Sequence, residues 1–367
     1  MHRSEVLFSR LKAIVVTPKQ ANSLRIVDTE VPEPKRGELQ LEVQKVGVCG
    51  TDRDIVAGFY GEAPEGSDYL VLGHESLSRV SDVGAGVSRF RKGDLVVPTV
   101  RRNCFENCLN CRSGESDMCL TGDYREHGIK GLHGFAREFA ISDSRFVVKL
   151  PESLSDLGIL LEPLTVVEKG EVQTFKLQEG RMKWQPKKAL VLGAGPVGLL
   201  ATAILRLRGL DVDTVATRSK ESLKARLVEQ TGARYINAKE TPLNLLEGKY
   251  DIVFEITGST SVAFEAQQLI GVNGVLCFLG IYKAQQDTGD PGKLFTNIVL
   301  GNKVLFGSVN ANKTYFEKGV KDLQAIRRKW NGFLEKTITR RASYEDLQKA
   351  YSPESEEEIK TIIEFRK

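Results

Sequence analysis

The sequence predicts an α/β protein in which a β-rich part is combined with a doubly wound parallel sheet. Two observations predict this class. From Leu11 to about Leu150, short strand-like segments alternate with turn residues. From Lys187 onward, an apolar strand, a glycine turn, an amphipathic helix and a second strand follow one another. The length of 367 residues fits about two domains.

The β-rich part carries strand-like segments at 11–16, 39–48, 69–83 and 94–100, with turns such as "PEPKRGE" and "GVSRFRKGD" between them. A helical pattern begins near Ser155 and continues to about Leu177. The first ten residues show no pattern and are expected to form a disordered extension.

The second part begins with the strand-like "ALVLG", the turn, the helix and then "DVDTVAT". Further strand-like segments lie at 250–258, 274–281 and 303–311, with helical stretches between them. This alternation predicts a parallel sheet with helices on both faces. After Asn310 the chain is helical and charged, and it closes with the strand-like "IKTIIEF".

Composition narrows the class of protein. A hydrophobic content of 41% and a net charge of +4 are ordinary for a globular protein, and argue against nucleic-acid and membrane-surface partners. The N-terminal stretch lacks the features of a signal peptide, and no apolar run approaches the roughly 20 residues of a membrane span. We therefore expect a cytoplasmic protein with reduced thiols.

Four of the six cysteines lie within "CFENCLNCRSGESDMC", namely Cys104, Cys108, Cys111 and Cys119. A disulfide knot is disfavoured in a long cytoplasmic chain, and a redox pair at Cys108 and Cys111 would leave the other two unexplained. A nucleic-acid-binding finger is disfavoured by the acidic residues around the cluster. One structural zinc ion explains all four thiols.

The second motif is "GAGPVG", a G-x-G-x-x-G pattern that follows a strand and opens a helix. In this context Gly193 makes the turn, Gly195 lets a pyrophosphate approach the backbone, and Gly198 lets helix and strand pack closely. Pro196 and Val197 lie between them. The motif predicts a dinucleotide site.

The end of the following strand predicts which nucleotide is bound. NAD-binding sites place a carboxylate there, whereas this chain has Thr217, Arg218 and Ser219, with Asp211 and Asp213 earlier in the strand. A guanidinium at this position favours a 2′-phosphate, so we predict NADP as the preferred cofactor and NAD as the alternative. The competing interpretation is that Arg218 is only a solvated surface charge.

A further group of metal-ligating residues lies in the first part. "GVCGTD" contains Cys49, Thr51 and Asp52, "LGHES" contains His74 and Glu75, and "LLEPL" contains Glu162. Thiolate, imidazole and carboxylate suit a catalytic zinc ion that keeps one position open. Each residue alone is more often structural, but the combination with a cysteine cluster and a dinucleotide motif predicts a second zinc site.

With these motifs the chain resembles the zinc-dependent medium-chain dehydrogenases, and among them the archaeal glucose dehydrogenases. The resemblance runs from Leu11 to Phe365 and depends on "GVCGTDRDIVAG", "LVLGHES", "GDLVVPTVRRNC", "CRSGESDMCLTGDYREHGI", "ILLEPLTVVEKG", "VLGAGPVG" and "GSVNANKTYF". It implies a GroES-like, partly open β-barrel catalytic domain (1–186), an inserted Rossmann domain that binds NADP (187–310), and a return to the catalytic domain (311–367).

The same resemblance implies roles for individual residues. Cys49, His74, Glu75 and Glu162 would supply the ligands of the catalytic zinc, with Glu75 and Glu162 also close to the substrate. Asp52 would hold the His74 imidazole in its metal-binding tautomer. Thr51 would contact the reacting hydroxyl and pass on its proton. The positions matching sugar-binding residues are Glu126 and Asn310.

Three departures from the family pattern concern the cysteine loop and the substrate. Three residues, Phe105 to Asn107, separate the first two cysteines where two are usual, which makes Cys104 the ligand most in question. Val100 and Val166 stand where some relatives have Asn and Asp, and so remove potential hydrogen bonds to a sugar.

The sequence therefore predicts a glucose (aldose) 1-dehydrogenase that transfers hydride from sugar C1 to NADP, with two zinc ions per chain and a homotetrameric assembly implied by the family. Its partner is a small sugar. The alternatives are a polyol or secondary-alcohol dehydrogenase of the same superfamily and a non-catalytic NADPH-binding sensor.

Overall fold

The structure is a computed structural model that describes residues 11–30, 33–282, 291–352 and 355–365. The extension expected at the first ten residues lies outside this described part. The chain forms two compact units. The first contains residues 1–162, 311–317 and 338–367, and the second contains residues 163–310 and 318–337.

The observed second unit keeps the expected boundary at 310/311, but it begins at residue 163 rather than 187 and also includes residues 318–337. Most of helix α3 (Leu161–Glu179) and part of α8 (Lys313–Lys329) therefore group with it. The reason is packing. A Cβ at Gly170 of α3 would lie 3.3 Å from Cys277 Sγ, in the sheet of this unit. On α8, Asp322 pairs with Arg208, which in turn contacts Glu171 of α3.

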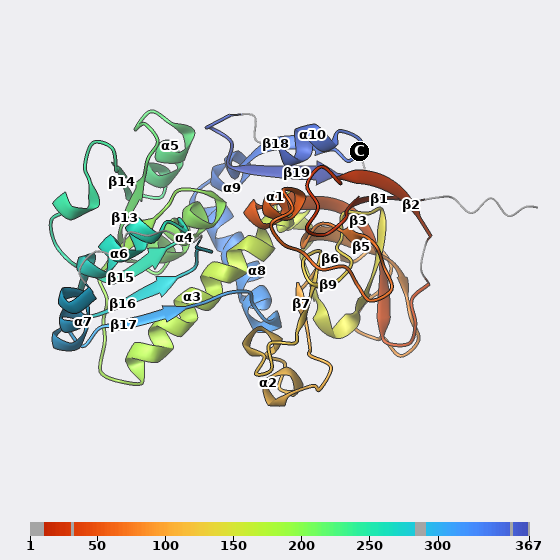
Figure 1. Ribbon diagram of the computed structural model, residues 1–367, viewed down its shortest axis with the longest axis horizontal. Helices are drawn as coiled ribbons and strands as arrows, with labels where there is room; N and C mark the ends of the chain where they lie inside the picture. The colour runs from red at the N-terminus through yellow and green to blue at the C-terminus, as the bar shows by residue number, and fades with distance from the viewer. Residues whose placement is uncertain (1–10, 31–32, 283–290, 353–354, 366–367) are drawn as a thin grey trace, which may run out of the picture. The chain divides into compact units, whose positions relative to one another are not determined.

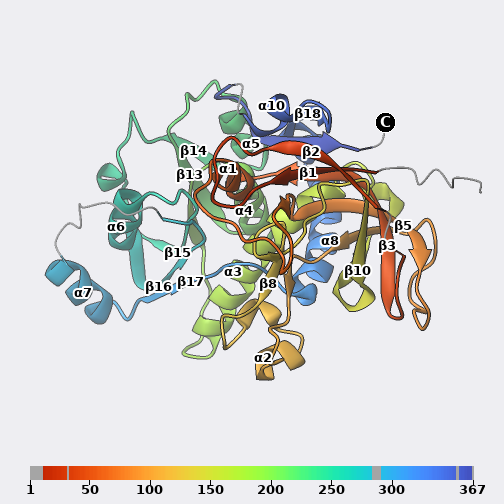
Figure 2. The ribbon, with the colours of Figure 1, turned by 45° about the vertical axis from the view of Figure 1, so that its right-hand side comes forward.

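The first unit is built on a seven-stranded sheet in the order β11-β6-β5-β3-β19-β18, with β10 also pairing with β3 (Figures 1 and 2). Two three-stranded sheets, β2-β1-β4 and β7-β8-β9, complete the β-structure described for it. Alternating burial along β3 is typical of a strand with one face on a core. That core includes Ile14, Val46, Leu70, Phe135 and Ile363.

The strands of the first unit are β1 (Leu11–Val16), β2 (Arg25–Thr29), β3 (Glu38–Val48), β4 (Leu70–Val71), β5 (Glu75–Val83), β6 (Leu95–Pro98), β7 (Arg101–Arg102), β8 (Arg125–His127), β9 (Gly131–Leu132), β10 (Phe139–Asp143), β11 (Val147–Lys149), β18 (Ile338–Ser343) and β19 (Lys360–Glu364). Its helices are α1 (Gly50–Val56), α2 (Leu109–Arg112) and α10 (Leu347–Tyr351). Short 3-10 turns lie at Ser116–Met118, Ser144–Phe146, Glu152–Leu154 and Gly158–Leu160.

The second unit contains a six-stranded parallel sheet in the order β14-β13-β12-β15-β16-β17 (Figure 1). Helix α4 packs on β12 and β13, α5 on β14, and α6 on β15 and β16. This sheet, with its helices, confirms the doubly wound class predicted from the sequence.

The strands of this unit are β12 (Lys188–Leu192), β13 (Asp211–Ala216), β14 (Arg234–Asn237), β15 (Tyr250–Glu255), β16 (Ile270–Phe278) and β17 (Val304–Gly307). Besides α3 and α8, its helices are α4 (Pro196–Leu207), α5 (Leu223–Gln230), α6 (Thr260–Leu269), α7 (Pro291–Leu300) and α9 (Phe333–Thr337), with a 3-10 turn at Leu243–Leu245. Among the described residues, no helix is long and apolar enough to span a bilayer.

Candidate active site

The candidate metal site begins where β3 ends and α1 starts. Cys49 is the N-cap of α1, and its sulfur accepts a hydrogen bond from the Thr51 amide at 3.1 Å. The Asp52 carboxylate accepts one from the Cys49 amide at 2.9 Å, which completes a capping box. The residues of "CGTD" therefore fix the helix start and, in the same turn, the direction of the thiol.

His74 faces this turn from the loop between β4 and β5. Its Nε2 lies 3.2 Å from Cys49 Sγ, and its Nδ1 lies 3.4 Å from Asp52 Oδ1. Burial opposes a charge on the imidazole, but the facing Cys49 and Asp52 outweigh it and hold the pKa of His74 well above its usual range. The site therefore favours a positive charge between these groups.

Two more carboxylates converge on His74. Glu75 begins β5, Glu162 is the second residue of α3, and both side chains are buried. One ligand atom from each of His74, Glu75 and Glu162 lies within 4.8 Å of the others, as do those of Cys49, Asp52 and His74. Burial, reinforced by Glu75 and Asp52, raises the pKa of Glu162 to about 7. An anionic surplus of thiol and carboxylates around one imidazole fits a divalent zinc ion.

Sequence reasoning missed Lys360, which β19 places beside this group. Its ammonium forms an ion pair with Glu75 and donates to the Val48 carbonyl at 3.1 Å. Gly47 makes room for the pair, because a Cβ there would lie 2.0 Å from Glu75 Oε2 and 3.0 Å from the Lys360 side chain. No local pattern marks Lys360, because only the pairing of β19 with β3 brings it here. Tyr60 was missed as well; burial raises the pKa of its hydroxyl, and the Thr51 side chain opposes this shift.

The four clustered cysteines also meet in the first unit. One sulfur from each of Cys104, Cys108, Cys111 and Cys119 lies within 4.8 Å of the others, and all are free thiols. Backbone N–H groups of Leu120 and Cys111 lower the pKa of the Cys108 thiol to about 6. The extra loop residue is absorbed by a turn in which Asn107 adopts φ 48°, so that Cys104 still reaches the other three. Four convergent thiols fit a tetrahedral zinc ion.

The glycine motif lies between β12 and α4 in the second unit. Gly193 has φ 110° and donates to the Val215 carbonyl at 2.8 Å, which positions the turn over β13. A Cβ at Gly198 would lie 2.0 Å from the Gly193 carbonyl oxygen, whereas one at Gly195 would meet nothing within 4 Å. Gly195 is the N-cap of α4 and supplies no side-chain cap, and Pro196 and Val197 start the helix. The open backbone above Gly195 can accept a pyrophosphate.

The nucleotide-selecting positions follow β13. Thr217 and Ser219 are exposed and Arg218 is half-buried, with its carbonyl accepting from the Tyr235 hydroxyl at 2.8 Å. Asp213 is buried inside the strand, where it binds Arg234 at 2.7 and 2.8 Å and Tyr250 at 2.6 Å. Because Arg234 and Tyr250 already bind the Asp213 carboxylate within the sheet, Asp213 is not a ribose-binding carboxylate.

The two expected sugar-binding residues belong to different units. Glu126 lies on β8, where Arg101 donates to its Oε1 through Nε at 3.0 Å and through Nη2 at 2.9 Å. Asn310 is the last residue of its stretch of the second unit and adopts φ 58°. The preceding carbonyl, of Val309, accepts from the buried Lys169 ammonium at 3.0 Å. Arg101 and Lys169 are supporting residues that the sequence did not single out.

The parallel sheet with its glycine turn and the two clusters of metal-ligating side chains are the features of a zinc-dependent dehydrogenase. Comparison with known families agrees. Residues 35–152 match the family described as "Alcohol dehydrogenase GroES-like domain", and residues 155–365 match that described as "Glucose dehydrogenase C-terminus".

Similar proteins cover nearly the whole chain. A glucose 1-dehydrogenase from Methanocella arvoryzae is 45% identical over 359 residues, 97% of this chain and 99% of the relative. One from Thermoproteus tenax is 45% identical over 356 residues, 97% of this chain and 100% of the relative. The solved structure of Haloferax mediterranei glucose dehydrogenase in complex with NADP, Zn and gluconolactone has a TM-score of 0.89 and 32% identity, and covers 97% of this chain and 99% of that one.

The chain therefore belongs to the glucose dehydrogenase family of the zinc-dependent medium-chain dehydrogenases. This confirms the family, the oxidoreductase class and the combination of a GroES-like domain with a Rossmann domain that the sequence predicted.

Proposed function

We propose that this protein oxidises glucose and related aldoses at C1, with NADP as the hydride acceptor and the aldonolactone as product. The observation that carries the proposal is the placement of the His74 ring between Cys49 on one nitrogen and Asp52 on the other, with Glu75 and Glu162 beside it. The names of the relatives and the NADP, Zn and gluconolactone in the Haloferax structure support the choice of sugar and nucleotide.

The proposed ligands of the catalytic zinc are Cys49 and His74, together with Glu75 or Glu162. A zinc ion there supplies Lewis acidity, which makes the sugar C1 hydroxyl easier to deprotonate. The Asp52 carboxylate faces His74 Nδ1 at 3.4 Å, which leaves Nε2 as the metal-facing nitrogen. The second proposed zinc ion is structural and is held by Cys104, Cys108, Cys111 and Cys119.

The remaining steps belong to the residues of this chain. Thr51 accepts a hydrogen bond from the C1 hydroxyl and passes its proton towards solvent. The C1–H bond breaks and its electron pair passes with the hydrogen to nicotinamide C4, so that the sugar is oxidised and the cofactor reduced. Glu126 and Asn310 bind other sugar hydroxyls. Gly193, Gly195 and Gly198 hold the pyrophosphate, and Thr217, Arg218 and Ser219 surround the 2′-phosphate.

We further propose a homotetramer in the cytoplasm, where the thiols of the cysteine cluster stay reduced. Strand β17 is the edge of its sheet, and its neighbour α7 exposes Phe295, Val299 and Leu300. Exposed edges with apolar neighbours favour pairing with another copy. Light scattering should give four times the chain mass of 40.7 kDa.

Steady-state assays with NADP test the activity. Glucose and at least one of galactose and xylose should be oxidised with far higher kcat/KM than ethanol or sorbitol. The reason is that Glu126 and Asn310 form hydrogen bonds with sugar hydroxyls other than the one at C1. A best kcat/KM for ethanol or sorbitol would remove the sugar assignment and would favour the polyol or secondary-alcohol alternative. Absence of turnover with every alcohol, despite NADPH binding, would favour a sensor.

A further inference from the structure

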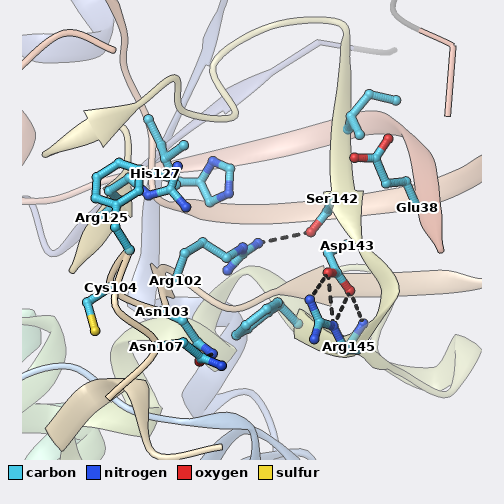
Figure 3. Close-up of a pocket in the computed structure, with 14 residues that line it drawn as sticks. Glu38, Arg102, Asn103, Cys104, Asn107, Arg125, His127, Ser142, Asp143 and Arg145 are labelled. Carbon is cyan, nitrogen blue, oxygen red and sulfur yellow. Dashed lines mark hydrogen bonds and ion pairs between the residues drawn. The ribbon is translucent and has the colours of Figure 1, made fainter. Parts of the chain in front are cut away.

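A cavity of about 450 Å³ lies in the first unit beside the cysteine cluster and has no part in the proposed reaction. Three arginines line it, Arg102 from β7, Arg125 from β8 and Arg145 from the turn after β10 (Figure 3). Cys104 and Asn107 of the cysteine loop form another part of its wall. The cavity therefore joins a group of cations to the segment that holds the cysteine cluster.

The charges of this cavity do not cancel. Asp143 is engaged by Arg145, whose Nε and Nη2 donate to it at 2.6 to 3.1 Å (Figure 3). Glu38 also lines the cavity and accepts from the Lys35 amide at 2.9 Å. Three guanidinium groups therefore face two carboxylates in this lining, which leaves a surplus of one positive charge.

Arg102 is buried, with 8% of its surface exposed. The hydrogen bonds that the structure shows for it run to the carbonyl and hydroxyl of Thr99, the carbonyl of Arg101 and the hydroxyl of Ser142, which are all uncharged acceptors. Burying a guanidinium against neutral acceptors costs free energy that a nearby anion would offset.

Arg125 adds an unsatisfied donor. Its guanidinium stacks on the Phe105 ring at 4.5 Å, and its Nε is buried without a hydrogen-bond partner in the described part of the chain. Buried polar groups in folded proteins are nearly always paired, so this unpaired N–H shows that the Arg125 guanidinium lacks an acceptor within the described part of the chain.

A second cavity of about 280 Å³ shares Asn103, Asn107, Arg145 and Phe146 with the first, and adds Arg112 and Lys313. Positively charged residues therefore line both cavities. Guanidinium groups bind phosphate through paired N–H donors, and amides and an ammonium add further donors.

From this geometry we propose that the paired cavities bind a phosphate group, either free or carried by a small metabolite, with Arg102 and Arg125 as the principal donors. The bound anion would tie β7 and β8 to Phe105 and Cys104 of the cysteine loop, so its occupancy would stabilise that loop. The proposal does not depend on the substrate assigned above.

Inorganic phosphate titrated into the zinc-loaded enzyme tests the site. Saturating NADP keeps phosphate out of the cofactor site, and replacement of chloride at constant ionic strength removes general salt effects. Phosphate should raise the midpoint of thermal unfolding with a saturable dependence. Arg125→Gln should weaken phosphate binding about tenfold or more, the effect of losing one charge-assisted hydrogen bond.

Arg91→Gln is the matched control, because Arg91 is a solvent-exposed arginine that lines neither cavity. If Arg125→Gln does not fold, Arg145→Gln serves instead, since that side chain is largely exposed. Equal phosphate affinity in Arg91→Gln and the cavity variants, or no saturable binding in the wild type, would overturn the proposal.

Glycerol 3-phosphate distinguishes the two sources of phosphate. Binding tighter than that of inorganic phosphate, and lost in Arg125→Gln, would assign the site to a phosphorylated metabolite. Equal binding of the two would assign it to the free ion. Either result supports an oxyanion site, whereas insensitivity of both ligands to Arg125→Gln refutes it.

Discussion

Lys360 and Glu75 form an ion pair in the interior of the first unit, with side chains 1% and 2% exposed. Lys360 is the first residue of β19, and Glu75 belongs to the candidate metal site. Removing one member of a buried pair leaves the other as an uncompensated charge, which is far more costly than losing a surface pair.

Lys360→Met should therefore lower the free energy of unfolding by about 3–5 kcal/mol in urea titrations. The control is Lys12→Met, which breaks an exposed pair with Asp28 and should leave the free energy of unfolding nearly unchanged. Equal effects of the two substitutions would show that Lys360 is not a structural counter-ion for Glu75.

Zinc content is the next measurement. Elemental analysis of the loaded enzyme should give two zinc ions per chain, and mild chelation should remove the catalytic one first, because its coordination is open. Cys111→Ser should retain one zinc ion and lose stability more than activity per folded molecule. Cys277→Ala is the control, since this buried thiol lies outside both clusters and its loss should leave two zinc ions. A measured content of one zinc ion per chain in the wild type would contradict the proposal of separate catalytic and structural zinc sites.

Arg218→Ala should reduce the preference for NADP over NAD. A charge-assisted hydrogen bond to the 2′-phosphate contributes about 1.5–3 kcal/mol, which corresponds to about 10- to 150-fold in relative kcat/KM. The loss should appear in the KM for NADP, because the 2′-phosphate does not react. Lys220→Ala is the control, as this exposed side chain pairs with Glu240 at 2.7 Å. If the Lys220 variant loses the preference and the Arg218 variant keeps it, the phosphate is read by Lys220.

Glu168 predicts a pH dependence of stability. Burial raises the pKa of this carboxyl from its usual 4.5 to about 8, although Lys318 lies against it. Between pH 4.5 and about pH 8, the Glu168 carboxyl is therefore protonated in the folded state and ionised in the unfolded state. Stability from this group is complete below pH 4.5 and is lost as the pH rises towards 8.

Glu168→Gln cannot titrate, so relative to wild type it should gain stability between pH 5 and pH 8, by a few kcal/mol at most. Denaturant unfolding at both pH values measures the difference. Glu152→Gln is the control, because Glu152 is solvent-exposed. A pH-independent difference between wild type and Glu168→Gln would show that the carboxyl is ionised throughout.

The sequence predicted those elements whose pattern is local. Strand β1, the turn at Gly193 and the convergence of four cysteines follow from residues close together in the chain. The segment 69–83, expected as one strand, is two strands separated by Leu72–His74, and this break places His74 in a loop facing Cys49. Gly73 adopts φ 86° at this break, a turn conformation that the apolar residues on either side do not reveal.

The residues that sequence reasoning missed act over long separations. Lys360 reaches Glu75 only through the pairing of β19 with β3, and Lys169 reaches Val309 from another element. Strand β18 was missed because it lies within a charged, helix-rich region, where its buried Ile338, Arg340 and Ala342 alternate with exposed residues. Such contacts depend on topology rather than on spacing in the sequence.

The pairing of β19 with residues 45–48 of β3 also determines when the first unit can be completed. A chain synthesised from its N-terminus presents this part of β3 early, and its partner β19 emerges only after β12 to β17 have been made. Strands β12 to β17, in contrast, follow one another without interruption and can fold while translation continues. Because Lys360 arrives with β19, the pocket that captures the proposed catalytic cation is finished only after the strands of the second unit have been synthesised, and metal loading would then follow that stage.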